Sequence, residues 1–122
     1  MAKYNPRWKN GSLRRKYRQR FRAMGASCGI CGGRLGPIHY DEPSDAAHPL
    51  SFVIDEIKPV SRWKAFGYAS PAHAAQDWNN LQAAHYCCNA AKGAKAYFKF
   101  PPGAKMDTAV KMVPANRSDG VW

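Results

Sequence analysis

Apolar residues recur at helical spacing in the first quarter of the chain. Four of them are three or four positions apart: Leu13, Tyr17, Phe21 and Met24. This spacing predicts a helix over 12–24 with one apolar stripe. Ser12 is a suitable N-cap for this helix, and Gly25 is a suitable residue to end it.

Two short apolar runs, 51–54 and 57–60, stand in the middle of the chain on either side of Asp55 and Glu56. Short runs of this kind, rich in β-branched and aromatic residues, predict β-strands. Pro59 has no backbone N–H, so the second run is not expected to form a central strand.

Two further helices are predicted nearer the C-terminal end. Ser70 can cap a short helix over 71–78, and the proline after Ser70 suits its first position. The pair at 79–80 ends this helix. The last helix is predicted from about Tyr86 to Ala96, weakened by a glycine in its last third.

The remaining segments are polar, glycine-rich or proline-bearing. A glycine-rich turn is expected at 28–36 and a loop at 37–49, with a short strand at 38–40. The pattern predicts one α+β domain with three parts. These are a basic arm at 1–11, a core at 12–99 and an extended tail at 100–122.

Charge is the first property to indicate a partner. The 122 residues carry 19 Lys and Arg against 8 Asp and Glu, a net charge of +11, and no acid precedes Asp41. Four arginines of the predicted first helix lie off its apolar stripe: Arg14, Arg15, Arg18 and Arg22. A surface this basic favours a nucleic-acid partner, with these arginines on phosphates. The alternative is a solvated basic face over an apolar core.

Cysteine spacing predicts a metal site. Cys28 and Cys31 form one pair with two residues between them, and His85 and Cys88 form another. Such a set predicts a closed tetrahedral zinc site of structural type. Two alternatives remain here, in which Cys87 replaces Cys88 as a ligand or His85 serves catalysis.

The cysteines also bear on location. The first residues have no apolar core typical of a secretory signal, and no run approaches the ~20 apolar residues of a membrane span. Four cysteines in such a chain favour metal over disulfides. We therefore expect a cytoplasmic protein with no membrane partner.

The order of these motifs resembles the HNH endonuclease family, in its small zinc-stapled phage and prophage form. The chain presents CxxC, a strand ending in Asp55-Glu56, an Ile-x-Pro-x-Ser turn, Asn80-Leu81, and two ligands followed by Asn-x-x-Lys-Gly. The resemblance covers about 14–95. It implies a ββα-metal (His-Me finger) fold, two short antiparallel strands and a helix around one divalent ion, here with a CCHC zinc knuckle and a basic N-terminal helix.

The resemblance also implies roles for individual residues. The family's first strand ends in Asp-His, so Asp55 matches the metal-binding aspartate and Glu56 fills the position of the general base. Asn80 would tie the following loop to the strand and hold the base. Asn89 would be the second ligand of a catalytic Mg²⁺ or Mn²⁺. Lys92 follows Asn89 by three residues on the predicted helix, so it points to a phosphate or is a plain solvated lysine.

Glu56 departs from the family pattern, and three interpretations are open. It is a base with a pKa raised by burial or by Asp55, a second metal ligand, or the mark of a weakened nuclease. Adjacent residues of a strand point to opposite faces, so convergence with Asp55 requires a bend at the strand end. His48 is an alternative base.

The leading hypothesis is a metal-dependent endonuclease that hydrolyses DNA phosphodiester bonds with a structural zinc. We expect a monomer in the cytoplasm of a bacterial host, and the resemblance implies work beside phage terminase or portal proteins. The second hypothesis is a zinc module without catalysis that binds DNA or a packaging protein. A third is a homing or restriction nuclease with sequence specificity.

Overall fold

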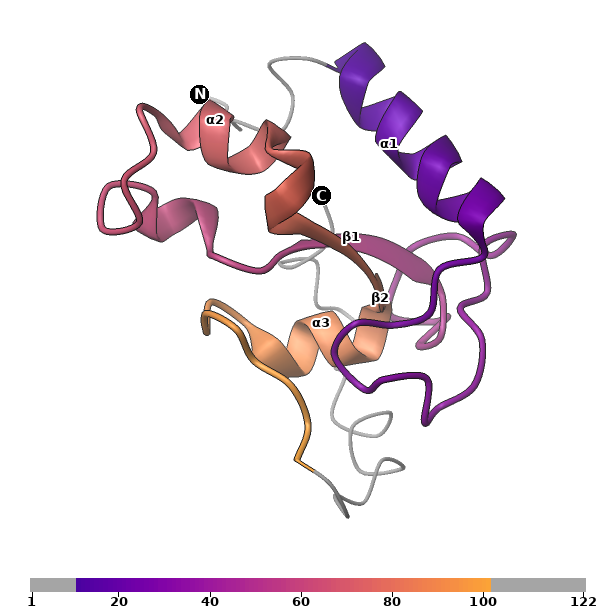
Figure 1. Ribbon diagram of the computed structural model, residues 1–122. Helices are drawn as coiled ribbons and strands as arrows, with labels where there is room; N and C mark the ends of the chain where they lie inside the picture. The colour runs from indigo at the N-terminus through magenta and orange to yellow at the C-terminus, as the bar shows by residue number, and fades with distance from the viewer. Residues whose placement is uncertain (1–10, 102–122) are drawn as a thin grey trace.

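The computed structural model describes residues 11–101, an α+β arrangement built around a two-stranded antiparallel sheet (Figure 1). Its elements, in chain order, are α1 (Gly11–Met24), β1 (Phe52–Glu56), the 3₁₀ turn η2 (Val60–Arg62), α2 (Pro71–Gln76), the 3₁₀ turn η3 (Trp78–Asn80), β2 (Leu81–His85) and α3 (Tyr86–Lys92). Most of the predicted basic arm and of the tail falls on 1–10 and 102–122, outside the described residues.

The sheet pairs β1 with β2, and β2 leads directly into α3. The register sets Phe52 opposite His85 and Glu56 opposite Leu81. Every residue of β1 is buried. Because side chains alternate between the faces of a strand, this register decides which polar groups share a face.

The predicted second strand at 57–60 is wrong. Ile57 and Lys58 form a bend, and Val60 begins η2 after Pro59. The proline cannot donate to a ladder, which accounts for the end of pairing. The true second strand, β2, has two alanines of low β propensity, so its composition gave little strand signal. The predicted strand at 38–40 is reduced to a single bridge between His39 and Ser51.

Capping signals mark the end of α1 and the start of α2, but Ser12 is not the predicted N-cap of α1, because the helix already includes Gly11. α1 ends before Gly25, whose φ of +59° suits glycine. The hydroxyl of Ser70 accepts a hydrogen bond from the His73 N–H, which confirms the predicted start of α2. α2 is shorter than predicted because residues 78–80 form η3. α3 stops at Lys92 rather than Ala96, since Gly93 adopts a φ of +58°.

The core packs α1 against the sheet. Phe21 stacks on Trp78 with ring centroids 4.6 Å apart and meets the edge of Phe52 at 6.1 Å. The predicted apolar stripe is therefore mostly correct, but Met24 is 61% exposed and lies outside it. A smaller cluster joins Val60 and two alanines of α2 to Trp63 and Tyr68.

The segment after α3 is tied back to the turn that carries Cys28 and Cys31. The Phe100 N–H donates to the Ile30 carbonyl at 3.1 Å, and the Arg34 guanidinium donates to the carbonyls of Phe100 and Pro101. The predicted extended tail at 100–122 is thus corrected at its first two residues, which belong to the folded unit. No helix of the described part combines the length and apolar character needed to cross a membrane.

Candidate functional site

Three cysteines and one histidine meet in the interior. The ligand atoms of Cys28, Cys31, His85 and Cys88 all lie within 4.8 Å of one another, and all four residues are buried. Cys28 and Cys31 come from the turn after α1, His85 ends β2, and Cys88 lies in the first turn of α3. The prediction that these four residues form one cluster is confirmed.

Backbone hydrogen bonds hold the turn at 28–36, the predicted zinc knuckle, against the sheet. The Gly29 N–H donates to the Ala83 carbonyl at 2.9 Å. The N–H groups of Cys31 and His85 point to the Cys28 sulfur at 3.5 and 3.4 Å. A sulfur that accepts two N–H bonds is stabilised as a thiolate, the form that binds metal.

The electrostatics of the cluster suit a soft divalent ion. The hydrogen bond from the Cys88 thiol, with that from His85, lowers the pKa of Cys28 to about 3 against the effect of burial. Burial opposes protonation of His85, but the neighbouring Cys28 and Cys31 sulfurs raise its pKa to about 9. Three sulfurs and one imidazole nitrogen, closed off from solvent, are the donor set of a structural zinc site.

Cys87 does not belong to this cluster. It is fully buried, and its N–H donates to the Pro49 carbonyl at 2.9 Å. The ligand group contains Cys88 instead, as the spacing to His85 favoured. Cys87 is therefore a small residue of the core.

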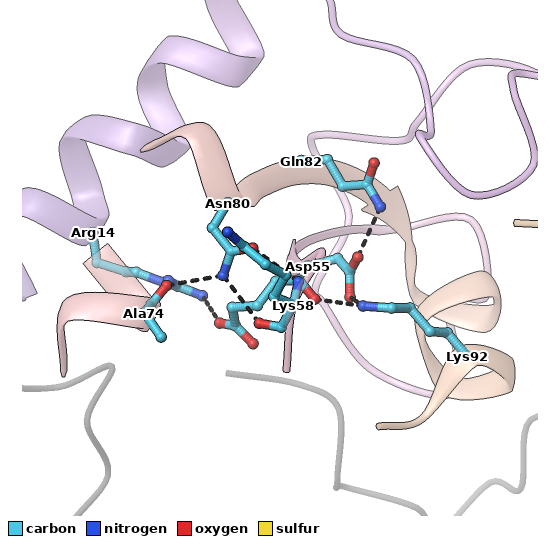
Figure 2. A network of polar contacts seen from close by, with 8 residues as sticks. Arg14, Asp55, Lys58, Ala74, Asn80, Gln82 and Lys92 are labelled. Carbon is cyan, nitrogen blue, oxygen red and sulfur yellow. Dashed lines mark hydrogen bonds and ion pairs between the residues drawn. The ribbon is translucent and has the colours of Figure 1, made fainter. Parts of the chain in front are cut away.

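A second polar site lies around Asp55 (Figure 2). Its side chain is 3% exposed, and its two oxygens are held separately. Lys92 of α3 donates to Oδ1 at 2.7 Å, and Gln82 of β2 donates to Oδ2 at 2.8 Å. Burial raises the pKa of Asp55, and Lys92 and Gln82 act in the opposite direction.

Lys92 is not the exposed phosphate contact that the sequence predicted. Its side chain is 2% exposed, and its ammonium also donates to the Glu56 carbonyl. A buried lysine requires a counter-charge, and Asp55 supplies it. Lys92 and Asn89 are three residues apart on α3, so they lie on the same face of that helix. Asn89 is 7% exposed.

Glu56 makes its ion pair on the other side of the sheet. Its Oε2 lies 3.1 Å from a guanidinium nitrogen of Arg14 on α1. Both Asp55 and Glu56 lie inside β1, so the bend required to bring them together is not formed. The interpretation of Glu56 as a second ligand beside Asp55 is therefore not supported.

Arg14 is corrected for the same reason. The sequence placed it on a solvated face toward phosphates, but its side chain is only 11% exposed. It also donates to the Ala75 carbonyl at 2.8 Å. Arg14 therefore joins α1 to β1 and α2. Arg15 and Arg22 are exposed and Arg18 is half-buried.

Asn80 fixes the chain just after the acidic pair. Its Oδ1 accepts from the Lys58 N–H at 2.8 Å, and its Nδ2 donates to the carbonyls of Lys58 and Ala74 at 3.0 and 3.2 Å (Figure 2). The side chain is fully buried and uses both ends of its amide. It thus joins the loop after β1 to α2. His48, the alternative base, bonds Asp45 in the loop before β1 at 2.8 Å.

Gln82 is a site residue that the sequence analysis missed. It stands opposite Asp55 in the sheet register, which places both side chains on one face. A Cβ added to Gly29 would lie 2.6 Å from the Gln82 Cδ and closer to its Oε1. The absence of a side chain at Gly29 thus leaves room for Gln82 to reach Asp55. A glycine between two cysteines was the available signal, but only the register identifies its neighbour.

We expect Gly29→Ala to rotate Gln82 away from Asp55. The new Cβ would clash with the end of the Gln82 side chain, which is flexible and can move. Overpacking and the lost bond to a charged group should lower stability by about 1–3 kcal/mol. In thermal unfolding, Gln82→Ala is expected to relieve part of this loss in the double variant. Strict additivity of the two changes would contradict the contact. Gly11→Ala, at the exposed start of α1, is the control.

No family model matches the chain, and neither curated proteins nor solved structures gave a match.

Proposed function

We propose that this protein is a metal-dependent endonuclease of HNH type that hydrolyses DNA phosphodiester bonds. The observation that carries the proposal is the contact of Lys92 with Asp55. It turns one face of α3 toward the carboxylate of β1, and Asn89 lies on that face, directly after the ligand Cys88. A β1–β2–α3 unit fastened at a Cys/His cluster is the framework expected of a ββα-metal site.

The donors at this site suit a hard divalent ion. A carboxylate from Asp55 and an amide oxygen from Asn89 are the ligand types that Mg²⁺ and Mn²⁺ prefer. Each carboxylate oxygen has a second lone pair, so the bonds from Lys92 and Gln82 leave acceptor capacity on Asp55. When bound there, such an ion would polarise a phosphate and stabilise the leaving oxygen.

The chain's own residues then have distinct tasks. Gln82 and Lys92 fix the orientation of the Asp55 carboxylate, and Lys92 supplies its counter-charge. Asn80 holds the loop after β1 in place. Glu56 is the base that the resemblance implies, but its pairing with Arg14 holds its carboxylate on the α1 side of the sheet, away from Asp55.

The biological setting follows the resemblance. We propose DNA as the substrate and a monomer as the active form, in the cytoplasm of a bacterial host. Work beside phage terminase or portal proteins is part of the same proposal. The first test is nicking of supercoiled plasmid by zinc-loaded protein, with and without added Mg²⁺ or Mn²⁺. No nicking with either ion would contradict the proposal.

The ion pair of Glu56 with Arg14 favours a second candidate, a zinc module that binds DNA or a packaging protein without cutting. The guanidinium holds the Glu56 carboxylate on the α1 side of the sheet, whereas Asp55 faces α3. A catalytically weak protein would retain the zinc cluster and the basic surface, and lose only the chemistry.

Replacement of Glu56 by histidine separates the two candidates. If Glu56 supports catalysis, wild type nicks plasmid and Glu56→His changes the rate by less than about 100-fold, the lower range of a general-base contribution. Nicking by Glu56→His alone would establish the second candidate. Glu42→His, in an exposed loop, is the matched control and should behave as wild type.

A further inference from the structure

A cavity of about 220 Å³ lies beside α1, away from the contacts of Asp55. Its lining, here called the arginine pocket, consists of Arg15, Arg18, Gln19, Arg22, Tyr40 and Phe52. The first four follow the i, i+3, i+4, i+7 spacing of one helix face. Tyr40 comes from the loop after the zinc knuckle, and Phe52 begins β1. None of the six is acidic.

The central guanidinium of the pocket is held in place. Arg18 lies over the Phe52 ring, 4.6 Å from its centroid, and the Tyr40 ring packs against Phe52 at 4.7 Å. Burial and the charge of Arg14 lower the pKa of Arg18. The positive charge of Arg18 is therefore incompletely compensated by its protein neighbours.

The acids nearby do not neutralise the pocket. Among the described residues, Asp41 pairs with Arg22, but the two side chains are 83% and 59% exposed. Exposed pairs of this kind contribute little and exchange readily. Glu56 is committed to Arg14, one turn earlier on α1. Three arginine side chains therefore line a cavity that has one weakly held counter-charge among residues 11–101.

We propose that the arginine pocket binds a phosphate group of a nucleic-acid backbone. A guanidinium group can donate two parallel hydrogen bonds to the oxygens of one phosphate. Three arginines on one helix face therefore suit a single tetrahedral anion. The proposal rests on the proposed function only in naming DNA as the source of the phosphate. Phe52 precedes Asp55 by three strand residues, about 10 Å. Because this is an odd number of residues, the two side chains lie on opposite faces of β1, and the pocket is a contact separate from the Asp55 site.

Salt dependence of DNA binding tests the pocket without any cleavage. Zinc-loaded protein and a fluorescent duplex are measured by anisotropy with no other divalent ion present. Loss of one phosphate contact in Arg15→Gln or Arg18→Gln should weaken binding about tenfold and reduce the salt slope by about 0.9. Arg15 is exposed, so its variant is informative even if Arg18→Gln is destabilised.

Arg20→Gln is the matched control, because it removes the same charge from the same helix. Arg20 lies over Trp78, 4.0 Å from its ring centroid, and does not line the pocket. An equal loss in Arg20→Gln would mean diffuse attraction to the whole helix and would overturn the proposal.

The source of the phosphate is distinguished by NMR of the arginine side chains. Shifts of the Arg15, Arg18 and Arg22 Nε–H signals by duplex, but not by the same concentration of inorganic phosphate, support a backbone phosphate. Tighter binding of inorganic phosphate than of duplex would overturn the DNA assignment. If DNA binds at the pocket but plasmid is not nicked, only the proposed endonuclease function is contradicted. If plasmid is nicked and the pocket variants bind DNA as wild type does, only the proposal for the pocket is contradicted.

Discussion

Cys88→Ala is expected to abolish stoichiometric zinc binding and to unfold the domain. Within 11–101, the four buried residues Cys28, Cys31, His85 and Cys88 are the only group of three or more His, Cys, Asp or Glu side chains that could hold a metal ion. Structural zinc contributes about 10–16 kcal/mol in small zinc domains, as much as the ~5–15 kcal/mol stability of a whole domain. The fold should therefore not survive loss of the ion.

The neighbouring Cys87→Ala provides a control of identical chemistry one residue away. Cys87 is equally buried but lies outside the ligand group, so this variant should keep one zinc per chain. Elemental analysis gives the metal content, and circular dichroism gives the thermal transition. Zinc retained by Cys88→Ala and lost by Cys87→Ala would reverse the ligand assignment. A zinc-selective chelator should unfold wild type in the same assay.

Asp55→Asn is expected to reduce metal-dependent nicking by at least about 100-fold. The substitution keeps the shape of the side chain and removes the charged donor of the proposed catalytic ion, a contribution of several kcal/mol to the transition state. The measurement is the rate of plasmid nicking at saturating Mg²⁺ or Mn²⁺. Glu42→Gln, at a loop carboxylate paired with His39, should retain wild-type activity.

Loss of activity in Asp55→Asn could also come from loss of stability, and this effect must be separated from loss of the metal ligand. The change leaves the Lys92 ammonium buried without its counter-charge, which costs about 3–5 kcal/mol. In Asp55→Asn/Lys92→Met the charge is removed with its partner, and stability should return while nicking stays absent. Nicking restored in that double variant would show that Asp55 acts only through the fold.

Local signals predicted several parts of this structure from the sequence. The two ligand pairs, the start of α2 at Ser70 and the end of α1 at Gly25 depend on spacing or capping within a few residues. The local sequence is enough to predict such features, because a helix cap or a pair of ligands depends only on residues a few positions away.

Other expectations failed where the sequence pattern was equally clear. The apolar run 57–60 has the composition of a strand, yet 81–85 forms it. Arg14 and Lys92 are cations of the kind usually found on a surface. Both are nevertheless buried, each in an ion pair with a carboxylate of β1. Neither outcome is visible in local composition, because each depends on a partner distant in the chain.

The sequence by itself determined the four members of the Cys/His cluster, the end of α1, the start of α2 and the strong positive charge. Only the tertiary structure decided that β1 sends Asp55 toward α3 and Glu56 toward α1, and that Gln82 stands opposite Asp55. The physical reason is that strand register and the packing of helices on each face are set by burial across the whole domain. One residue of slippage in the sheet would exchange the partners of both acids.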